Sequence, residues 1–152
     1  MFVVDTNILI YAAHAPSPEH ERCRSLLEEW RRGSSPWFVT WPICYEFLRV
    51  TTHPRVFDRP WETPDAFAFL EALLASPSLS ILEPTPRHAR VLHEMLVTVS
   101  GLRGNILHDV HTAVLMREHG ISRIVTRDMD FHRFPGLTIV DPAVPGTTDL
   151  SS

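Results

Sequence analysis

The sequence contains no lysine, only two cysteines and no long hydrophobic run. All 14 basic residues are therefore arginines, whose planar guanidinium group suits carboxylate and phosphate partners. Cys23 and Cys44 stand apart rather than in a CxxC pair, which argues against a disulfide framework and against a zinc site. No apolar run reaches the roughly 18 residues of a membrane span, and no secretory signal pattern opens the chain. We expect a cytoplasmic protein with no membrane association.

The composition is that of a folded, soluble protein. Of its 152 residues, 44% are hydrophobic and 21% are charged, close to the averages for globular domains. A chain of this length can bury a sizeable core. We expect a single domain over residues 1–141, followed by a flexible tail over 142–152, which is rich in proline, glycine, serine and threonine.

Strand and helix patterns alternate along the chain. Ser17, Thr63 and Thr85 each precede a proline and are expected to cap a helix. Alternating strands and helices predict an α/β fold with a mostly parallel sheet, covered on both faces, whose functional sites lie at the carboxyl ends of the strands. Strands are expected at about 2–5, 37–40, 79–83, 123–126 and 137–141, and helices at about 7–14, 18–32, 42–52, 64–75, 86–99 and 107–119.

Carboxylates from four separate segments are expected at this edge of the sheet. Asp5 follows the first strand, and Glu46 lies one turn into the helix after the second strand. Asp109 lies in the first turn of the helix that precedes the fourth strand, and Asp128 and Asp130 follow that strand. Like charges about 4 Å apart repel by on the order of 4 kcal/mol at an effective dielectric constant of 20. The cluster therefore predicts a bound cation.

Each acid also has a simpler explanation when taken alone. Asp5 could cap a helix, and Glu46 could pair with Arg49 three residues later. Asp109 could stabilise the positive end of its helix, and Asp128 could close an Asx-turn. The coincidence of all four segments at one edge favours the metal site. Oxygen ligands favour Mg²⁺ or Mn²⁺, and the chemistry they imply is phosphodiester hydrolysis by a metal-activated water.

The motifs VVDTNILI, YEFLRV, LHDVHTAVL and IVTRDMDF, in this order, resemble those of PIN-domain nucleases. Within that family the chain is most similar to VapC-type toxins of bacterial toxin–antitoxin modules, over residues 2 to about 141. The resemblance implies a three-layer α/β/α sandwich with a five-stranded sheet. It also implies an Mg²⁺- or Mn²⁺-dependent endoribonuclease, often acting on tRNA or rRNA, with a cognate antitoxin and a homodimeric state.

The resemblance also assigns roles to individual residues. It makes the four acids Asp5, Glu46, Asp109 and Asp128 both catalytic and metal-binding, adds Asp130 as an auxiliary metal ligand, and gives Asn7 and Thr126 the role of orienting the acids. One departure from the family pattern is Val110-His111, where small residues are more usual. His111 is therefore either a residue of the helix face or a contact to the substrate.

Candidate RNA contacts come from two loops. Arg103 lies in SGLRGN, and Arg55, Arg59 and Trp61 lie in HPRVFDRPW. Arginine forks on phosphates and a stacking aromatic ring would suit single-stranded RNA. The alternative is that these are ordinary solvated loop arginines. The net charge of -4 does not oppose RNA binding, because the five proposed site acids account for -5 and the rest of the chain carries +1.

Other interpretations stay open. His108 and His111 could bind a transition metal, although one short stretch rarely supplies a full ligand set. A catalytically silent PIN-like module that binds a protein is the main alternative function. A phosphoacceptor receiver domain is disfavoured by the missing lysine. The helix at 64–75 is apolar on more than one face, so it is either deeply buried or covered by a partner, and we favour a partner.

Overall fold

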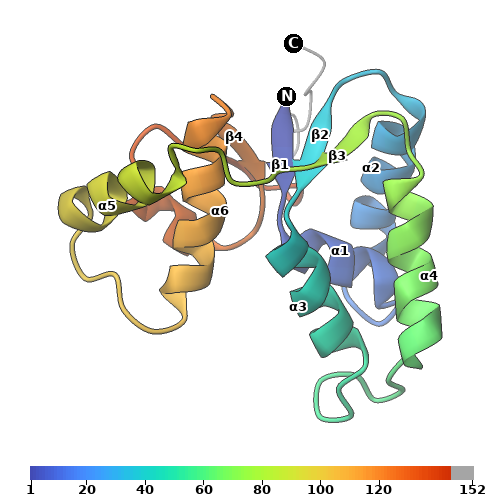
Figure 1. Cartoon of the computed structure of the whole chain (residues 1–152). Helices are drawn as coiled ribbons and strands as arrows, with labels where there is room; N and C mark the ends of the chain where they lie inside the picture. The colour runs from blue at the N-terminus through green and yellow to red at the C-terminus, as the bar shows by residue number, and fades with distance from the viewer. Residues whose placement is uncertain (145–152) are drawn as a thin grey trace.

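The computed structural model describes residues 1–144, and this part of the chain forms six α-helices, one 3₁₀ helix and five strands. Figure 1 shows their arrangement. In chain order they are β1 (Phe2–Val4), α1 (Thr6–Ala13), α2 (His20–Arg32), β2 (Trp37–Val39), α3 (Trp41–Thr51), α4 (Thr63–Leu74), β3 (Leu79–Ile81), α5 (His88–Thr98), α6 (Ile106–Glu118), β4 (Arg123–Val125), η1 (Met129–Arg133) and β5 (Thr138–Val140).

The five strands form one parallel sheet in the order β3-β2-β1-β4-β5. Val3 of β1 pairs with Phe38 of β2 on one side and with Ile124 of β4 on the other. The chain thus builds β2 and β3 to one side of β1 and later adds β4 and β5 to the other. The direction in which strands are added therefore reverses between β1 and β4. In parallel α/β sheets, ligands bind outside the carboxyl ends of the strands at such a point.

The helices form two groups that flank β1 (Figure 1). On one side α1 packs against α2 and α3, and α3 packs against α4, while on the other side α5 packs against α6. All three residues of β1 are fully buried, as expected for a central parallel strand. Among the described residues, no helix has the length and apolar character needed to cross a membrane.

The predicted fold class is confirmed, and each predicted strand and helix is present with ends within two residues of the expected ones. The predicted caps are wrong in detail. Glu62 occupies the cap position of α4 and Thr63 is its first residue, while Glu19 and Arg87 precede α2 and α5. The 3₁₀ helix η1 was not predicted. Of the predicted flexible tail, residues 145–152 lie outside the described residues.

The apolar helix α4 is mostly packed within the protein. Phe69 stacks on Phe47 of α3 with ring centroids 5.0 Å apart, and Leu70 and Leu73 are buried. Phe67 remains 48% exposed. Packing against α3 therefore explains most of the second apolar face that the sequence assigned to a partner.

Candidate metal centre

Asp5 lies at the end of β1, beside β4. Its backbone N–H donates to the carbonyl of Val125 at 3.1 Å, which extends the pairing of the two strands. Its Oδ1 accepts a 2.7 Å hydrogen bond from the Thr6 backbone N–H, so Asp5 also caps α1. Burial raises the pKa of Asp5, and the nearby charge of Asp128 adds to this against the hydrogen bonds from Thr126 and Thr6.

Asn7 and Thr126 connect Asp5 to the β4 loop. Asn7 Nδ2 donates to Asp5 Oδ2 at 2.8 Å and to Thr126 Oγ1 at 2.9 Å. The Thr126 hydroxyl donates to the same Asp5 oxygen at 2.7 Å and accepts from the Asp128 backbone N–H at 2.9 Å. A hydroxyl offers one donor and two acceptor positions, so that of the fully buried Thr126 is completely used. These bonds fix Asp5 relative to the backbone of Asp128.

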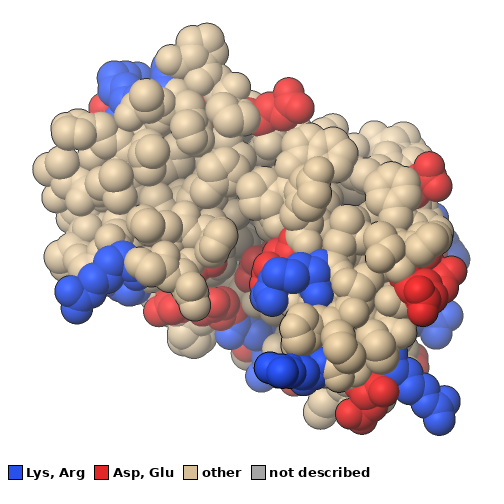
Figure 2. Space-filling model, turned by 60° about the horizontal axis from the view of Figure 1, so that its bottom comes forward, with Lys and Arg blue, Asp and Glu red and all other residues tan. Residues whose placement is uncertain are grey.

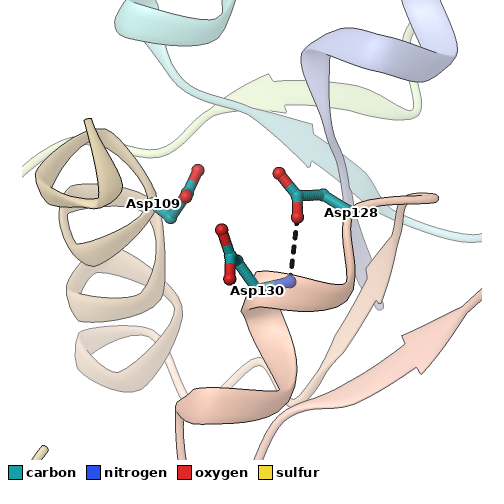
Figure 3. Close-up of side chains that lie close together, drawn as sticks. All are labelled: Asp109, Asp128 and Asp130. Atoms are coloured by element: carbon teal, nitrogen blue, oxygen red, sulfur yellow. Dashed lines mark hydrogen bonds between the residues drawn. The ribbon is translucent and has the colours of Figure 1, made fainter. Parts of the chain in front are cut away.

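Three carboxylates meet next to this network. Asp109 comes from the first turn of α6, and Asp128 and Asp130 come from the start of η1. One oxygen from each lies within 4.8 Å of the others. Figure 3 shows the three side chains directed toward a common point, with the Asp130 backbone N–H donating to Asp128 Oδ1 at 2.8 Å. The Asx-turn that was the alternative explanation of Asp128 is thus present, and it positions two acids of the cluster.

The electrostatics of Asp109 reflect this crowding. Burial raises the pKa of the Asp109 carboxyl to about 7. The negative charges of neighbouring carboxylates, in order Asp128, Asp5 and Asp130, contribute to the same shift. Negative charge at this point is therefore incompletely balanced by the protein, and a cation would balance it.

Glu46 stands apart from the three aspartates. It lies on α3 and is held by Arg49, whose Nε donates to Oε2 at 2.7 Å and whose second nitrogen donates to Oε1 at 2.5 Å. The hydrogen bonds from Arg49 lower the pKa of Glu46, and the charges of Arg49 and His108 act in the same direction. Glu46 thus forms the ion pair with Arg49 that was its alternative explanation, and it lies outside the group of Asp109, Asp128 and Asp130.

The face that holds the carboxyl ends of the strands lies at the bottom of Figure 1, where α1 follows β1. Figure 2 turns this face toward the viewer and shows acidic side chains gathered around a hollow, with basic side chains on its rim. Acidic and basic groups therefore meet on the face where the sheet topology favours a ligand.

The histidines near Asp109 do not join the cluster. Within the described residues, the group of possible metal ligands contains Asp109, Asp128 and Asp130 and no histidine. The His111 ring lies 5.7 Å from that of His88, and its buried Nδ1 has no hydrogen-bond partner within residues 1–144. Burial lowers the pKa of His111, which favours the neutral ring. These contacts favour a place for His111 in the packing of α5 against α6.

The four candidate RNA contacts lie in loops. Arg55 and Arg59 are exposed in the loop between α3 and α4, and Arg103 is exposed in the loop before α6. Trp61 is half-buried, because its ring packs edge-on against those of Phe47 and Phe69. Its outer side lines a shallow groove together with Arg59.

The two ion pairs of Arg127 were not expected from the sequence. Arg127, between Thr126 and Asp128, forms ion pairs with Glu19 of α2 and with Asp141, 3.5 Å away, after β5. The Thr126 hydroxyl, by contrast, contacts the acids as the resemblance implied. Thr126 lies in the motif IVTRDMDF, whereas Arg127 and Glu19 are 108 positions apart and no local sequence pattern indicates their contact.

Comparison with known proteins places this arrangement in a family. Residues 2–137 match the PIN domain. The chain is 36% identical to Ribonuclease VapC37 of Mycobacterium tuberculosis over 137 residues, 90% of this chain and 94% of that relative. It is 32% identical to Ribonuclease VapC25 of the same organism over 144 residues, 95% of this chain and 100% of that relative. The chain therefore belongs to the PIN-domain family, in its VapC ribonuclease branch, as the motifs predicted.

Solved structures agree on the fold. The VapBC2 complex of Rickettsia felis bound to a promoter DNA fragment has a chain that matches with a TM-score of 0.65 and 17% identity, covering 91% of this chain and 96% of that chain. VapC20 of Mycobacterium tuberculosis, described as a toxin that cleaves the sarcin–ricin loop, matches with a TM-score of 0.63 and 19% identity, covering 87% and 93%. At these identities the likeness establishes the shared fold.

Proposed function

We propose that this protein is a metal-dependent endoribonuclease that hydrolyses RNA phosphodiester bonds and acts as the toxin of a toxin–antitoxin module. The observation that carries the proposal is the convergence of the Asp109, Asp128 and Asp130 carboxylates within 4.8 Å at the carboxyl edge of a parallel sheet. A catalytically silent PIN-like module remains the alternative, but such a module would gain nothing from three carboxylates that repel one another.

The donor set fits Mg²⁺ or Mn²⁺. It consists of carboxylate oxygens, which these ions prefer, and the raised pKa of Asp109 reports negative charge that a cation would neutralise. The residues that would hold the ion are Asp109, Asp128 and Asp130, with Asp5 and Glu46 as further acids of the same edge. A bound ion supplies an activated water for attack on phosphorus and neutralises charge on the phosphate oxygens.

The protein's own part in the reaction is to hold this site rigid. Thr126 and Asn7 fix the Asp5 carboxylate, and the Asp128 side chain is fixed in turn by the Asp130 N–H. Acids held in this way need little reorganisation during the reaction, which is how preorganised sites lower barriers. Thr126 and Asn7 would therefore act by positioning the acids rather than by touching the substrate.

RNA binding is proposed for the loops that border this face. Arg55, Arg59 and Arg103 are exposed and can reach phosphates, while the exposed side of Trp61 can stack on one base. The substrate would be a structured RNA such as tRNA or rRNA. The description of VapC20 as a sarcin–ricin loop cleaving toxin supports an rRNA target in this fold.

The proposed partners are an antitoxin and a second copy of the chain. Structural neighbours that include VapBC of Salmonella typhimurium bound to DNA and FitAcB of Neisseria gonorrhoeae support an antitoxin. Exposed apolar side chains are available for such contacts. On the helices of the α1–α4 group, these include Trp41, Tyr45 and Phe67.

RNA cleavage with and without Mg²⁺ tests the proposal. Wild type should cleave RNA with Mg²⁺ and lose activity in EDTA, and Asp109→Asn should lose at least about 100-fold, as loss of a key electrostatic group commonly costs. Glu71→Gln, exposed on α4 and outside the groove that Arg59 and Trp61 line, is the control and should retain activity. Cleavage that survives both EDTA and Asp109→Asn would refute the proposal.

A further inference from the structure

Arg49 forms an unusual ion pair for an exposed helix side chain. Its guanidinium makes two hydrogen bonds with Glu46, of 2.7 and 2.5 Å, although the two side chains are 61% and 45% exposed. Arg90 and Glu94 on α5 form the ordinary kind of pair at nearly the same exposures, 63% and 47%, with one contact of 3.1 Å. Two hydrogen bonds fix the orientation of the Arg49 guanidinium plane, whereas a single hydrogen bond would leave it free to turn.

This pair lies on α3, the helix that starts at the same edge of the sheet as the acidic cluster. α3 begins at Trp41, directly after β2, and β2 pairs with β1, which Asp5 follows directly. α3 also packs against α1, the helix that Asp5 caps. Arg49 is thus a cation on a helix that borders the site. Arg127, which is adjacent to Asp128 in sequence, is engaged instead by Glu19 and Asp141.

The charge balance of the site calls for such a cation. The three clustered aspartates and Asp5 carry -4 when ionised, which is more than one divalent ion neutralises, and an RNA phosphate would add further negative charge. A phosphate at this edge therefore needs a positive partner from the protein, and a guanidinium fork matches phosphate geometry as well as it matches carboxylate geometry.

We propose that Arg49 binds the RNA phosphate next to the metal centre, exchanging its two-point contact with Glu46 for one with the phosphate. The inference rests on the proposed function and extends it by one substrate-binding residue. Glu46 released from Arg49 is then available to the metal. In the protein without RNA, Arg49 and Glu46 therefore stay paired with each other.

Two binding measurements test the exchange. The first is binding of a fluorescent single-stranded RNA of mixed sequence, with Ca²⁺ in place of Mg²⁺, over a range of salt concentrations. Loss of one phosphate contact in Arg49→Ala should weaken binding about tenfold and reduce the slope of log affinity against log salt by about 0.7. Arg49→Lys, which keeps the charge without the fork, should keep the slope.

The second measurement is Mn²⁺ binding without RNA, by calorimetry. Arg49→Ala should bind Mn²⁺ about three- to tenfold more tightly than wild type, because Glu46 is freed and a positive charge is removed. Weaker RNA binding together with tighter Mn²⁺ binding is a combination that a purely structural residue would not produce. Arg90→Ala should change neither quantity.

The outcomes separate this inference from the proposed function. If wild type binds Mn²⁺ and cleaves RNA but Arg49→Ala keeps the wild-type salt slope, Arg49 does not contact phosphate and only this inference is overturned. If Arg49→Ala weakens both RNA and Mn²⁺ binding, the exchange is likewise overturned. If wild type neither binds Mn²⁺ nor cleaves RNA, the proposed function fails and this inference fails with it.

Discussion

At the scale of single residues, the site depends on Asp5 and Thr126. Asp5 caps α1 and stands outside the group of three, but its charge interacts with those of Asp128 and Asp109, so its structural and functional explanations are compatible. The fully buried Thr126 hydroxyl connects Asp5 with the loop after β4, 121 positions away in the chain. One hydroxyl thus fixes the relative position of two strands at the edge where a ligand would bind.

Asp109 lowers the folding stability of the metal-free protein as the pH rises. Its pKa is raised from 3.8 to about 7, so the folded state binds the proton more tightly than the unfolded state. Folding stability attributable to this group therefore falls as pH rises from about 4 to about 7. Because the carboxyl is only half-buried, screening reduces the effect to about 1 to 2 kcal/mol.

Replacing the Asp109 carboxyl should remove this loss of folding stability at high pH. Asp109→Asn should be more stable than wild type at pH 8 without metal, and the difference should vanish near pH 4. Urea unfolding at both pH values in EDTA measures this. A variant that is less stable than wild type at pH 8 would contradict the assigned origin of the shift.

At the scale of elements, Glu118 joins α6 to the segment that starts α5. Its side chain is completely buried. It accepts hydrogen bonds from the Thr85 backbone N–H at 3.1 Å and from the Thr85 hydroxyl at 2.5 Å, and it contacts His88 Nδ1 at 2.7 Å. Burial alone would raise the pKa of Glu118, but the contacts with Thr85 and His88 outweigh it and lower the pKa.

This contact should matter above the usual glutamate pKa of 4.5. Since the folded-state pKa is depressed, the stabilisation is fully present above about pH 4.5 and is lost as pH falls through the lower folded value. Glu118→Ala should cost about 3 kcal/mol at pH 7, because it leaves buried donors unpaired. Urea unfolding should give this loss at pH 7 and a smaller loss at pH 3; equal losses would contradict the role of the charge.

The element boundaries also separate what local sequence determines from what it does not. Short β-branched and aromatic runs located all five strands, because a buried parallel strand needs little more than such a run. The caps at Ser17 and Thr85 were misplaced. The chain makes a turn before each helix, in which their carbonyls accept from His20 and His88, and the helix starts only afterwards.

At the scale of the whole molecule, the sequence was sufficient to predict that the acids lie at the carboxyl edge of the sheet, but not which side chains contact one another there. Asp109, Asp128 and Asp130 could be predicted to meet, because Asp109 lies at the start of the helix that leads back to β4 and the other two follow that strand. The orientation of Glu46 could not be predicted in the same way. Its pairing with Arg49, three residues later, and a position facing the metal both use the same face of α3. Ion pairs such as Arg127 with Glu19 depend on how α2 packs, which no local pattern encodes.

The central claim is that the aspartates of α6 and η1 form a divalent-metal centre. Calorimetric titration of the metal-free protein with Mn²⁺ tests it most directly, with wild type compared to Asp128→Asn and to Asp65→Asn on α4. Wild type and Asp65→Asn should bind Mn²⁺ alike, and Asp128→Asn should bind at least about tenfold more weakly, because it loses one charged ligand. Equal Mn²⁺ binding by all three proteins, or none by wild type, would contradict the account.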